Sequence, residues 1–248
     1  MRIALAVATA LVVASPAAAQ WKNIPPAPNL SAPTPRAADG KPDLSGVWQA
    51  DGQTYFFDLA AGLKPEDVVA LPRARALQQQ REANLHGDDP LARCLPHGVP
   101  RVNTNGLFPF KIVQTPTLVV LLYEQLNLFR QVFLDGRTLS ADVNPTWLGY
   151  STGRWEGDTL VIDTRGFNDK TWLDTQKGRP ASDALHVVER FRRPKLGDLE
   201  VVATIDDPKT YANAWTTTTQ HFKLQPNTDL MEFVCAEGEK DRAHMVGK

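Results

Sequence analysis

Residues 45–58 and most of the chain from residue 110 onward consist of short runs in which apolar and polar residues alternate, separated by residues that favour turns. The runs are rich in Val, Leu, Thr and aromatic residues, and a period of two is the pattern of a half-buried β-strand. Asp135-Gly136 and Gln225-Pro226-Asn227 are examples of the intervening turn sequences. We therefore expect strands at residues 45–50, 53–58, 111–114, 118–123, 128–134, 148–155, 159–165, 184–192, 199–205, 215–224 and 230–235.

One segment, residues 64–87, has a helical pattern instead. A proline followed by two acidic residues begins it, a second proline suits a first helical turn, and a glycine ends it. Ala74, Leu77 and Arg81 lie on one face of such a helix. The pattern predicts a helix at about residues 66–86 that covers one face or one mouth of the sheet.

The regular, hairpin-length spacing of the expected strands indicates an antiparallel meander. A sheet with this many strands removes its exposed edges by closing on itself. The expected fold class is therefore all-β, an antiparallel meander that closes into a β-barrel with one N-terminal helix. We expect it to form a single domain over residues 43–248.

The first residues have the pattern of a secretory signal peptide. An arginine precedes an apolar core at residues 3–14, and Ala17 and Ala19 suit a cleavage site, so residues 1–19 are the predicted signal. The apolar core is about 12 residues long, which is short of the ~20 that a spanning helix needs. Residues 20–42 are rich in proline and are expected to form an extended tether. The predicted location is the periplasm or the outside of the cell.

The chain has two cysteines, Cys94 and Cys235. An oxidising compartment favours a disulfide between them. A nucleophilic cysteine is the alternative, but the Pro and Gly-rich loop around Cys94 contains no obvious base partner.

Composition excludes some partners and cofactors. With 27 basic and 28 acidic residues, the chain offers no electrostatic argument for nucleic acid or for a membrane surface. No P-loop, dinucleotide-binding glycine motif or nucleophile elbow occurs, and no two histidines have HxH or HxxxH spacing. We therefore predict a small-molecule partner, no cofactor and no metal.

The stretch ALHVVERF, residues 184–191, contains His186 and Glu189. Its valines favour a strand, on which the two side chains point to opposite faces. Glu189 shares its face with apolar residues and is expected to point inward, where an unpaired charge costs several kcal/mol. Arg130 and Arg154 are its candidate partners. Three interpretations remain open, a structural ion pair, a ligand-binding or general-base carboxylate, and an outward, solvated side chain.

Several other residues are candidates for a site. The long loop at residues 166–183 contributes Asn168, Trp172 and Asp174, which suit the binding of a ring with polar substituents, although a buried Trp that pins the loop is equally consistent. His97 lies in the rigid loop beside Cys94 and is a candidate for the mouth of the barrel.

GKPDLSGVW, DDPLARCLPHGVPR, KIVQTPTLVVLLYE, GRWEGDTLVIDTRGFNDKTWLD, LHVVERFRR and TIDDPK together span nearly the whole mature chain. In these motifs the chain resembles a large group of exported bacterial proteins, a resemblance that implies no activity. The barrel form is similar to the lipocalin or calycin class, which is an analogy of fold and not of function.

Two functional hypotheses follow. A third alternative is a barrel with a filled interior that binds another protein of the cell envelope. The first is a cofactor-independent acid–base enzyme, a lyase, isomerase or hydrolase, that acts on a small aromatic or sugar-like substrate inside the barrel. The second is a lipocalin-like carrier in which the same groups serve recognition only. The expected catalytic residues are Glu189, His186, Asp174 and Tyr150, and the expected binding residues are Arg154, Arg130, Trp172, Asn168 and His97.

Overall fold

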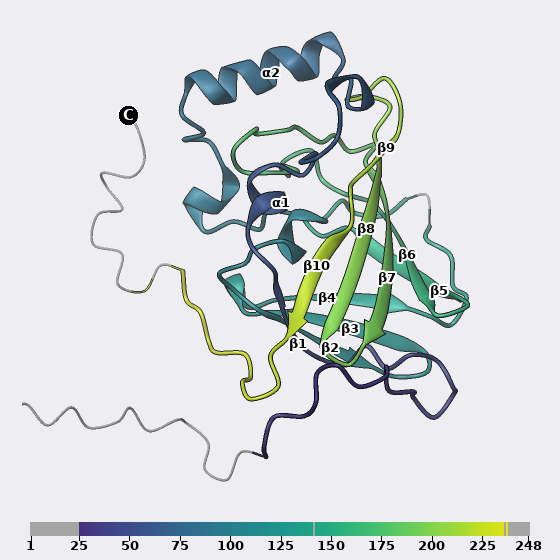
Figure 1. Cartoon of the computed structure of the whole chain (residues 1–248). Coiled ribbons are helices and arrows are strands. Elements are labelled where there is room, and N and C mark those ends of the chain that lie inside the picture. Colours follow the sequence, from purple (N-terminus) through teal and green to yellow (C-terminus); the bar gives the residue numbers. More distant parts are fainter. Residues whose placement is uncertain (1–24, 141, 236, 238–248) are drawn as a thin grey trace, which may run out of the picture.

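The computed structural model describes residues 25–140, 142–235 and 237. Ten strands of this part form one sheet, which closes because β10 pairs with β8 as well as with β1. Nine of these strands make the barrel, and β9 pairs only with the end of β8. Figure 1 shows how the strands are arranged. The predicted all-β barrel is confirmed. Its strands are β1 (Gly46–Ala50), β2 (Phe110–Gln114), β3 (Leu118–Tyr123), β4 (Leu128–Phe133), β5 (Tyr150–Glu156), β6 (Thr159–Arg165), β7 (His186–Lys195), β8 (Asp198–Asp206), β9 (Trp215–Thr216) and β10 (Gln220–Leu224).

Alternation along the strands sets the inner face of the barrel. In β7, Val187, Glu189 and Phe191 are buried, whereas His186 is only partly buried and Arg190 is exposed. This matches the faces expected from the sequence, because successive side chains of a strand point to opposite sides of the sheet.

One strand pair departs from the antiparallel meander. β4 and β5 are parallel, with Val132 opposite Ser151 and Phe133 opposite Thr152. The connection between them, residues 134–149, is too long for a hairpin turn and allows the chain to return in the same direction.

Helices and irregular segments cover one end of the barrel, which we call the mouth. α2 lies across this end, and α1 lies between α2 and the strands (Figure 1). The helices of the described residues are α1 (Thr54–Phe57), η1 (Pro65–Asp67), α2 (Pro72–Ala83), η2 (Pro90–Arg93), η3 (Arg101–Asn103) and η4 (Gln125–Asn127).

Two predicted elements near the N-terminus are wrong in part. Residues 53–58 contain the short helix α1 instead of a strand, because Phe56 turns inward and is buried. The helix expected at about 66–86 is divided, since Leu71 is extended before Pro72, as residues that precede proline usually are.

Residues 230–235 are also not a strand, since side chains bind part of their backbone and Glu124 accepts the N–H of Met231.

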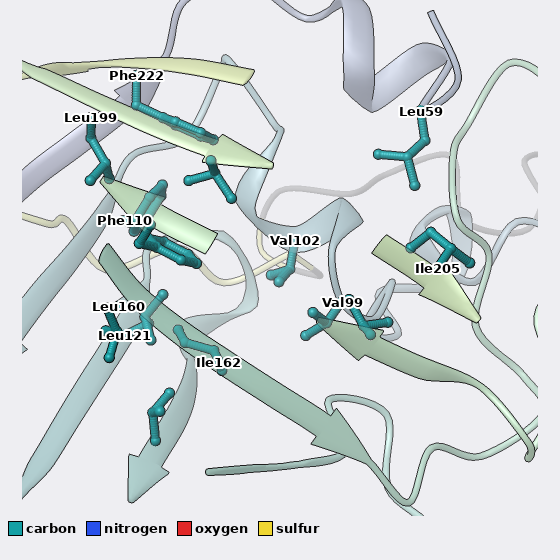
Figure 2. Packing of buried hydrophobic residues seen from close by; sticks show 14 of the residues in the cluster. Leu59, Val99, Val102, Phe110, Leu121, Leu160, Ile162, Leu199, Ile205 and Phe222 are labelled. Atoms are coloured by element: carbon teal, nitrogen blue, oxygen red, sulfur yellow. The ribbon is translucent and has the colours of Figure 1, made fainter. Parts of the chain in front are cut away.

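The core fills the inside of the barrel and continues to the mouth. Figure 2 shows Phe110, Leu121, Leu160, Leu199 and Phe222 meeting from five different strands. At the mouth, residues 95–105 form a segment that we call the plug. Its Val99 and Val102 are 1% and 6% exposed and lie toward the barrel core in Figure 2.

Both ends of the described chain are attached to the barrel. The predicted signal at 1–19 lies outside the described residues, but the Pro-rich segment is described from residue 25 and accepts N–H groups of Leu196 and Gly197 with the carbonyls of Ala32 and Leu30. Near the C-terminus a disulfide joins Cys94 to Cys235 and ties the start of the plug to the residues after β10.

The predicted pairing of Cys94 with Cys235 is therefore confirmed, with their Cα atoms 5.7 Å apart. A structural disulfide is typical of an oxidising compartment. Within the described ranges, the helices are too short or too polar to cross a membrane.

Candidate functional site

Glu189 lies inside the barrel and is completely buried. Arg130 of β4 donates from Nη2 to its Oε2 at 2.5 Å, and Asn103 of the plug donates from Nδ2 to its Oε1 at 2.6 Å. Tyr123 donates its hydroxyl to Oδ1 of Asn103 at 2.7 Å. The inward orientation and the predicted partner Arg130 are thus both observed. We call these four residues the polar layer.

The polar layer has further hydrogen bonds, although Nη1 of Arg130 is buried without a partner among the described residues. Arg130 also donates to Ser151 of β5 and to Thr164 of β6. Burial alone lowers the pKa of Arg130, but Glu189 and Tyr123 outweigh burial and hold the pKa above its ordinary value. This geometry matches the interpretation of Glu189 as a structural ion pair, because both oxygens are occupied and the side chain has no exposed surface.

The plug is held by a second buried ion pair. Arg101 is completely buried and binds Asp89 through two parallel bonds, of 3.0 and 2.6 Å. Its Nη2 also donates to Thr175 in the long loop at 2.6 Å. A bidentate pair fixes both position and orientation, so the plug is tied to the long loop.

His97 lies in the plug and is completely buried. Neither of its ring nitrogens has a hydrogen-bond partner among the described residues, and its ring meets Phe56 edge-on. Burial, aided by the charge of Arg101, lowers the pKa of His97 to about 3. The imidazole is therefore neutral and is closed off from the mouth at which we expected it to act.

A second polar cluster lies at the mouth itself. Arg179, in the long loop, donates from Nη1 to both Asp58 and Asp174. Asp58 directly follows α1, and Asp174 also accepts the backbone N–H groups of Leu59 and Arg179, each at 3.1 Å. These bonds hold the long loop against the end of α1. We call Asp58, Asp174 and Arg179 the mouth cluster.

The groups of the mouth cluster differ in exposure. The side chain of Asp174 is fully buried, that of Arg179 is 13% exposed and that of Asp58 is 26% exposed. Burial raises the pKa of Asp174 above its ordinary value, although Arg179 opposes this change. Asp174 is therefore an inner support of Arg179, and Asp58 is the carboxylate that meets solvent.

A cleft of about 360 Å³ opens beside the mouth cluster. We call it the mouth cleft. Asp58 and Arg179 contribute to its lining, and so does Gln78 of α2. Tyr211 also lines it, and its hydroxyl donates to the carbonyl of Pro180. Its lining is Asp58, Ala60, Ala61, Gly62, Leu63, Lys64, Pro65, Val68, Ala70, Gln78, Arg179 and Tyr211.

Two residues that line the mouth cleft carry polar atoms without a protein partner in the described part of the chain. Both bonds to the carboxylate of Asp58 end on Oδ1, so Oδ2 has no donor. Both bonds from the side chain of Arg179 begin at Nη1, so Nη2 and Nε have no acceptor. An acceptor and two donors thus lie on adjacent groups whose positions are fixed.

A third feature is a cleft of about 360 Å³ in the barrel wall between β4 and β5, which we call the wall cleft. It lies where the wall has its parallel strand pair. Arg130 and Ser151 contribute to a lining that is otherwise largely apolar. The lining is Phe129, Arg130, Gln131, Phe133, Thr146, Trp147, Leu148, Gly149, Tyr150 and Ser151.

Three of the predicted site residues on strands, His186, Arg154 and Tyr150, lie outside the polar layer and the mouth cluster. His186 is on the outer face and its Nε2 lies 2.8 Å from Asp163. Arg154 is exposed and pairs with Glu156 instead of Glu189, because it points away from the barrel interior. Tyr150 lines the wall cleft and donates its hydroxyl to the carbonyl of Asn144.

The aromatic candidate of the long loop has a packing role. Trp172 is 3% exposed, and the guanidinium of Arg81 lies 4.1 Å from the centroid of its ring. It therefore pins the loop to α2. Asn168 is partly buried and its Oδ1 accepts the N–H of Lys170 within a turn.

Sequence reasoning missed Asp58, Arg179 and Asn103. Asp58 is at the end of an expected strand, Arg179 lies in the long loop, and Asn103 lies in the short helix η3, where the sequence has no periodic pattern. The one available signal was the length of the loop at 166–183, because long loops in compact domains often carry function. Which side chain of this loop enters a site depends on how the loop packs against the barrel.

The described residues contain no group of three or more His, Cys, Asp or Glu side chains placed to hold a metal ion. Comparison with known proteins adds no assignment, since no protein-family model, no curated protein and no solved structure matches the chain.

Proposed function

We propose that this protein is a cofactor-independent acid–base enzyme that binds a small polar organic molecule in the mouth cleft. The observation that carries the proposal is Asp58, a partly exposed carboxylate whose Oδ2 faces no protein donor while Oδ1 is held by Arg179. A general base needs an accessible oxygen on a side chain whose position is fixed. Asp58 meets both conditions.

In this proposal Asp58 takes a proton from an O–H or C–H group of the substrate and becomes the neutral acid that returns a proton later in the cycle. Lyase, isomerase and hydrolase reactions all use such a transfer. Arg179 orients Asp58 and donates to the substrate. Asp174 is a positioning residue, because it contacts Arg179 and has no exposed surface.

The proposal moves the site away from the barrel axis, where we first expected it. Neither the mouth cleft nor the wall cleft is lined by Glu189, and core side chains occupy the inner face of the strands. The geometry supports a structural role for Glu189. His186 lies on the opposite face of β7 from Glu189, and its hydrogen-bond partner is Asp163 of β6 and not a residue of the mouth cluster.

The test is a turnover screen of the wild-type protein against neutral sugars, polyols and hydroxy acids, followed by two variants. Asp58→Asn removes the basic oxygen and is expected to lower kcat at least about a hundredfold, the usual scale of a general base. Asp206→Asn, at an exposed carboxylate on the end of β8, is the matched control. Equal turnover by both variants contradicts the proposal.

The wall cleft favours a second candidate, a carrier of an apolar or aromatic molecule. Phe129 is 62% exposed beside it, and Trp147 and Tyr150 contribute to its lining. Aromatic side chains with one polar anchor are common in small-molecule sites. Quenching of tryptophan fluorescence by an aromatic acid in the wild type, and its loss in Trp147→Leu, would favour the carrier.

We also propose that the protein is exported to the periplasm or secreted. The support is the signal pattern of residues 1–19 together with the disulfide between Cys94 and Cys235. Mass spectrometry of the protein from a cell envelope fraction tests this, with a mature chain that begins near Gln20 as the expected result. A chain that retains Met1 in the cytoplasm is the opposite outcome.

A further inference from the structure

We propose that the ligand of the mouth cleft is a neutral molecule with two adjacent hydroxyl groups, as in sugars and polyols. This inference rests on the proposed function of the mouth cleft and names the class of molecule that it binds. It is carried by the polar atoms that the cleft leaves without partners, by the balance of charge around them, and by the apolar residues beside them.

The polar atoms without hydrogen-bond partners on Asp58 and Arg179 complement each other. Oδ2 of Asp58 accepts hydrogen bonds, and Nη2 and Nε of Arg179 donate them. Because Asp58 and Arg179 are joined by an ion pair, this acceptor and these donors are close neighbours. One hydroxyl of a vicinal diol donates to Asp58 and the next accepts from Arg179, so a single diol satisfies both groups.

The ionisable side chains around the mouth cleft are the second feature that favours a neutral ligand. Around the cleft, two carboxylates, Asp58 and Asp174, accompany two basic side chains, Arg179 and the cleft residue Lys64. Acidic and basic groups are thus equal in number, which gives neither an anionic nor a cationic ligand a clear advantage. A carboxylate ligand would bind Arg179 but would also lie against Asp58, and like charges in a partly buried site repel.

The remaining lining and the size of the mouth cleft also suit a small ring with hydroxyl groups. Gln78 of α2 is partly buried, makes no hydrogen bond to a described residue, and offers both a donor and an acceptor. Ala60, Val68 and Ala70 provide an apolar surface for the C–H groups of a ring. A volume of about 360 Å³ lies in the lower part of the range for small-molecule sites.

A purely apolar ligand fits less well. It would cover Oδ2 of Asp58 and the free N–H groups of Arg179 and separate them from water without replacing the lost hydrogen bonds, and such burial is unfavourable. The same reasoning predicts a preference for a diol over a single alcohol with the same ring.

Four probes with one six-membered ring test the inference, namely myo-inositol, cis-1,2-cyclohexanediol, cyclohexanol and cyclohexanecarboxylate. Saturation-transfer NMR with the full-length mature protein measures their dissociation constants. We expect the two diol-bearing probes to bind about tenfold tighter than cyclohexanol and cyclohexanecarboxylate. Equal or tighter binding of either control overturns the inference, and so does the absence of binding by all four.

Variants place the binding in the mouth cleft. Gln78→Ala is expected to weaken the diols at least threefold, whereas Gln79→Ala, at the next and exposed position of α2, leaves them unchanged. Unequal effects in the opposite order, or no effect of Gln78→Ala, count against the inference. The proposed function fails separately, if turnover of an identified substrate is the same in Asp58→Asn and Asp206→Asn.

Discussion

Arg130 and Glu189 form an ion pair inside the barrel, with Nη2 of Arg130 2.5 Å from Oε2 of Glu189. Their side chains are 2% and 0% exposed. Arg130 belongs to β4 and Glu189 to β7, with β5 and β6 between them. The pair therefore bridges the wall beside the parallel junction of β4 and β5, where only two residue pairs are aligned.

Removal of one partner of this ion pair is expected to be severe. Glu189→Gln leaves Arg130 charged and buried without a counterion, which typically costs 3–5 kcal/mol of unfolding free energy. The double variant Glu189→Leu with Arg130→Met is expected to recover most of this loss. Urea unfolding monitored by circular dichroism provides the comparison, with Glu156→Gln, in an exposed ion pair, as the control.

A double variant no more stable than Glu189→Gln would contradict that explanation. A Glu189→Gln protein as stable as the wild type would show that the ion pair with Arg130 does not stabilise the fold.

His97 predicts a dependence of stability on pH. Its pKa falls from 6.5 in the unfolded chain to about 3 in the folded protein, so protons bind the unfolded state preferentially between these values. The stability of the fold therefore carries no penalty from His97 above pH 6.5. Below that pH the free energy of unfolding decreases as the pH falls. Between pH 8 and pH 5 the loss is on the order of 2 kcal/mol.

Unfolding free energies of wild type and His97→Asn over this pH range test the assignment. The variant is expected to lose this part of the dependence, whereas His221→Asn, at an exposed histidine, keeps it. Parallel curves for wild type and His97→Asn would show that another group titrates.

Gly98 predicts a cost of overpacking in the plug. Its φ is +77°, and a Cβ atom there would lie 2.6 Å from Cγ2 of Thr171. Gly136 has a similar φ of +79° but no neighbour within 4 Å. Both alanine variants strain the backbone, so the difference between them isolates the steric clash. We expect Gly98→Ala to cost about 1–3 kcal/mol more than Gly136→Ala, measured by thermal or urea unfolding.

Equal losses for the two glycine variants would mean that Thr171 moves aside freely. The plug would then be less tightly packed than its buried residues indicate.

The sequence predicted those features that follow from short-range pattern. The limits of β3 and β6 agree with the expected residue ranges, and the inward orientation of Glu189 follows from its place in an alternating strand. The pairing of Cys94 with Cys235 follows from the small number of cysteines and the expected compartment.

Features set by tertiary contacts were not predictable in this way. The run TYFF at 54–57 has aromatic residues that suit a strand, yet it forms α1 because Phe56 packs into the mouth. The mouth cluster combines Asp58, which directly follows α1, with two residues of the long loop that are more than a hundred positions away in the sequence. Local patterns do not encode such a meeting, because it depends on how the loop docks.

The location of the bound ligand tests most directly whether Asp58 and Arg179 form the functional site. The measurement is a titration of ¹⁵N-labelled protein with the compound that stabilises it most in a thermal-shift screen of sugars, hydroxy acids and aromatic acids. Amide signals of Gly62, Gln78 and Arg179 are expected to shift, and the shifts should weaken in Asp58→Asn. Shifts confined to Trp147 and its neighbours in the wall cleft would contradict the assignment.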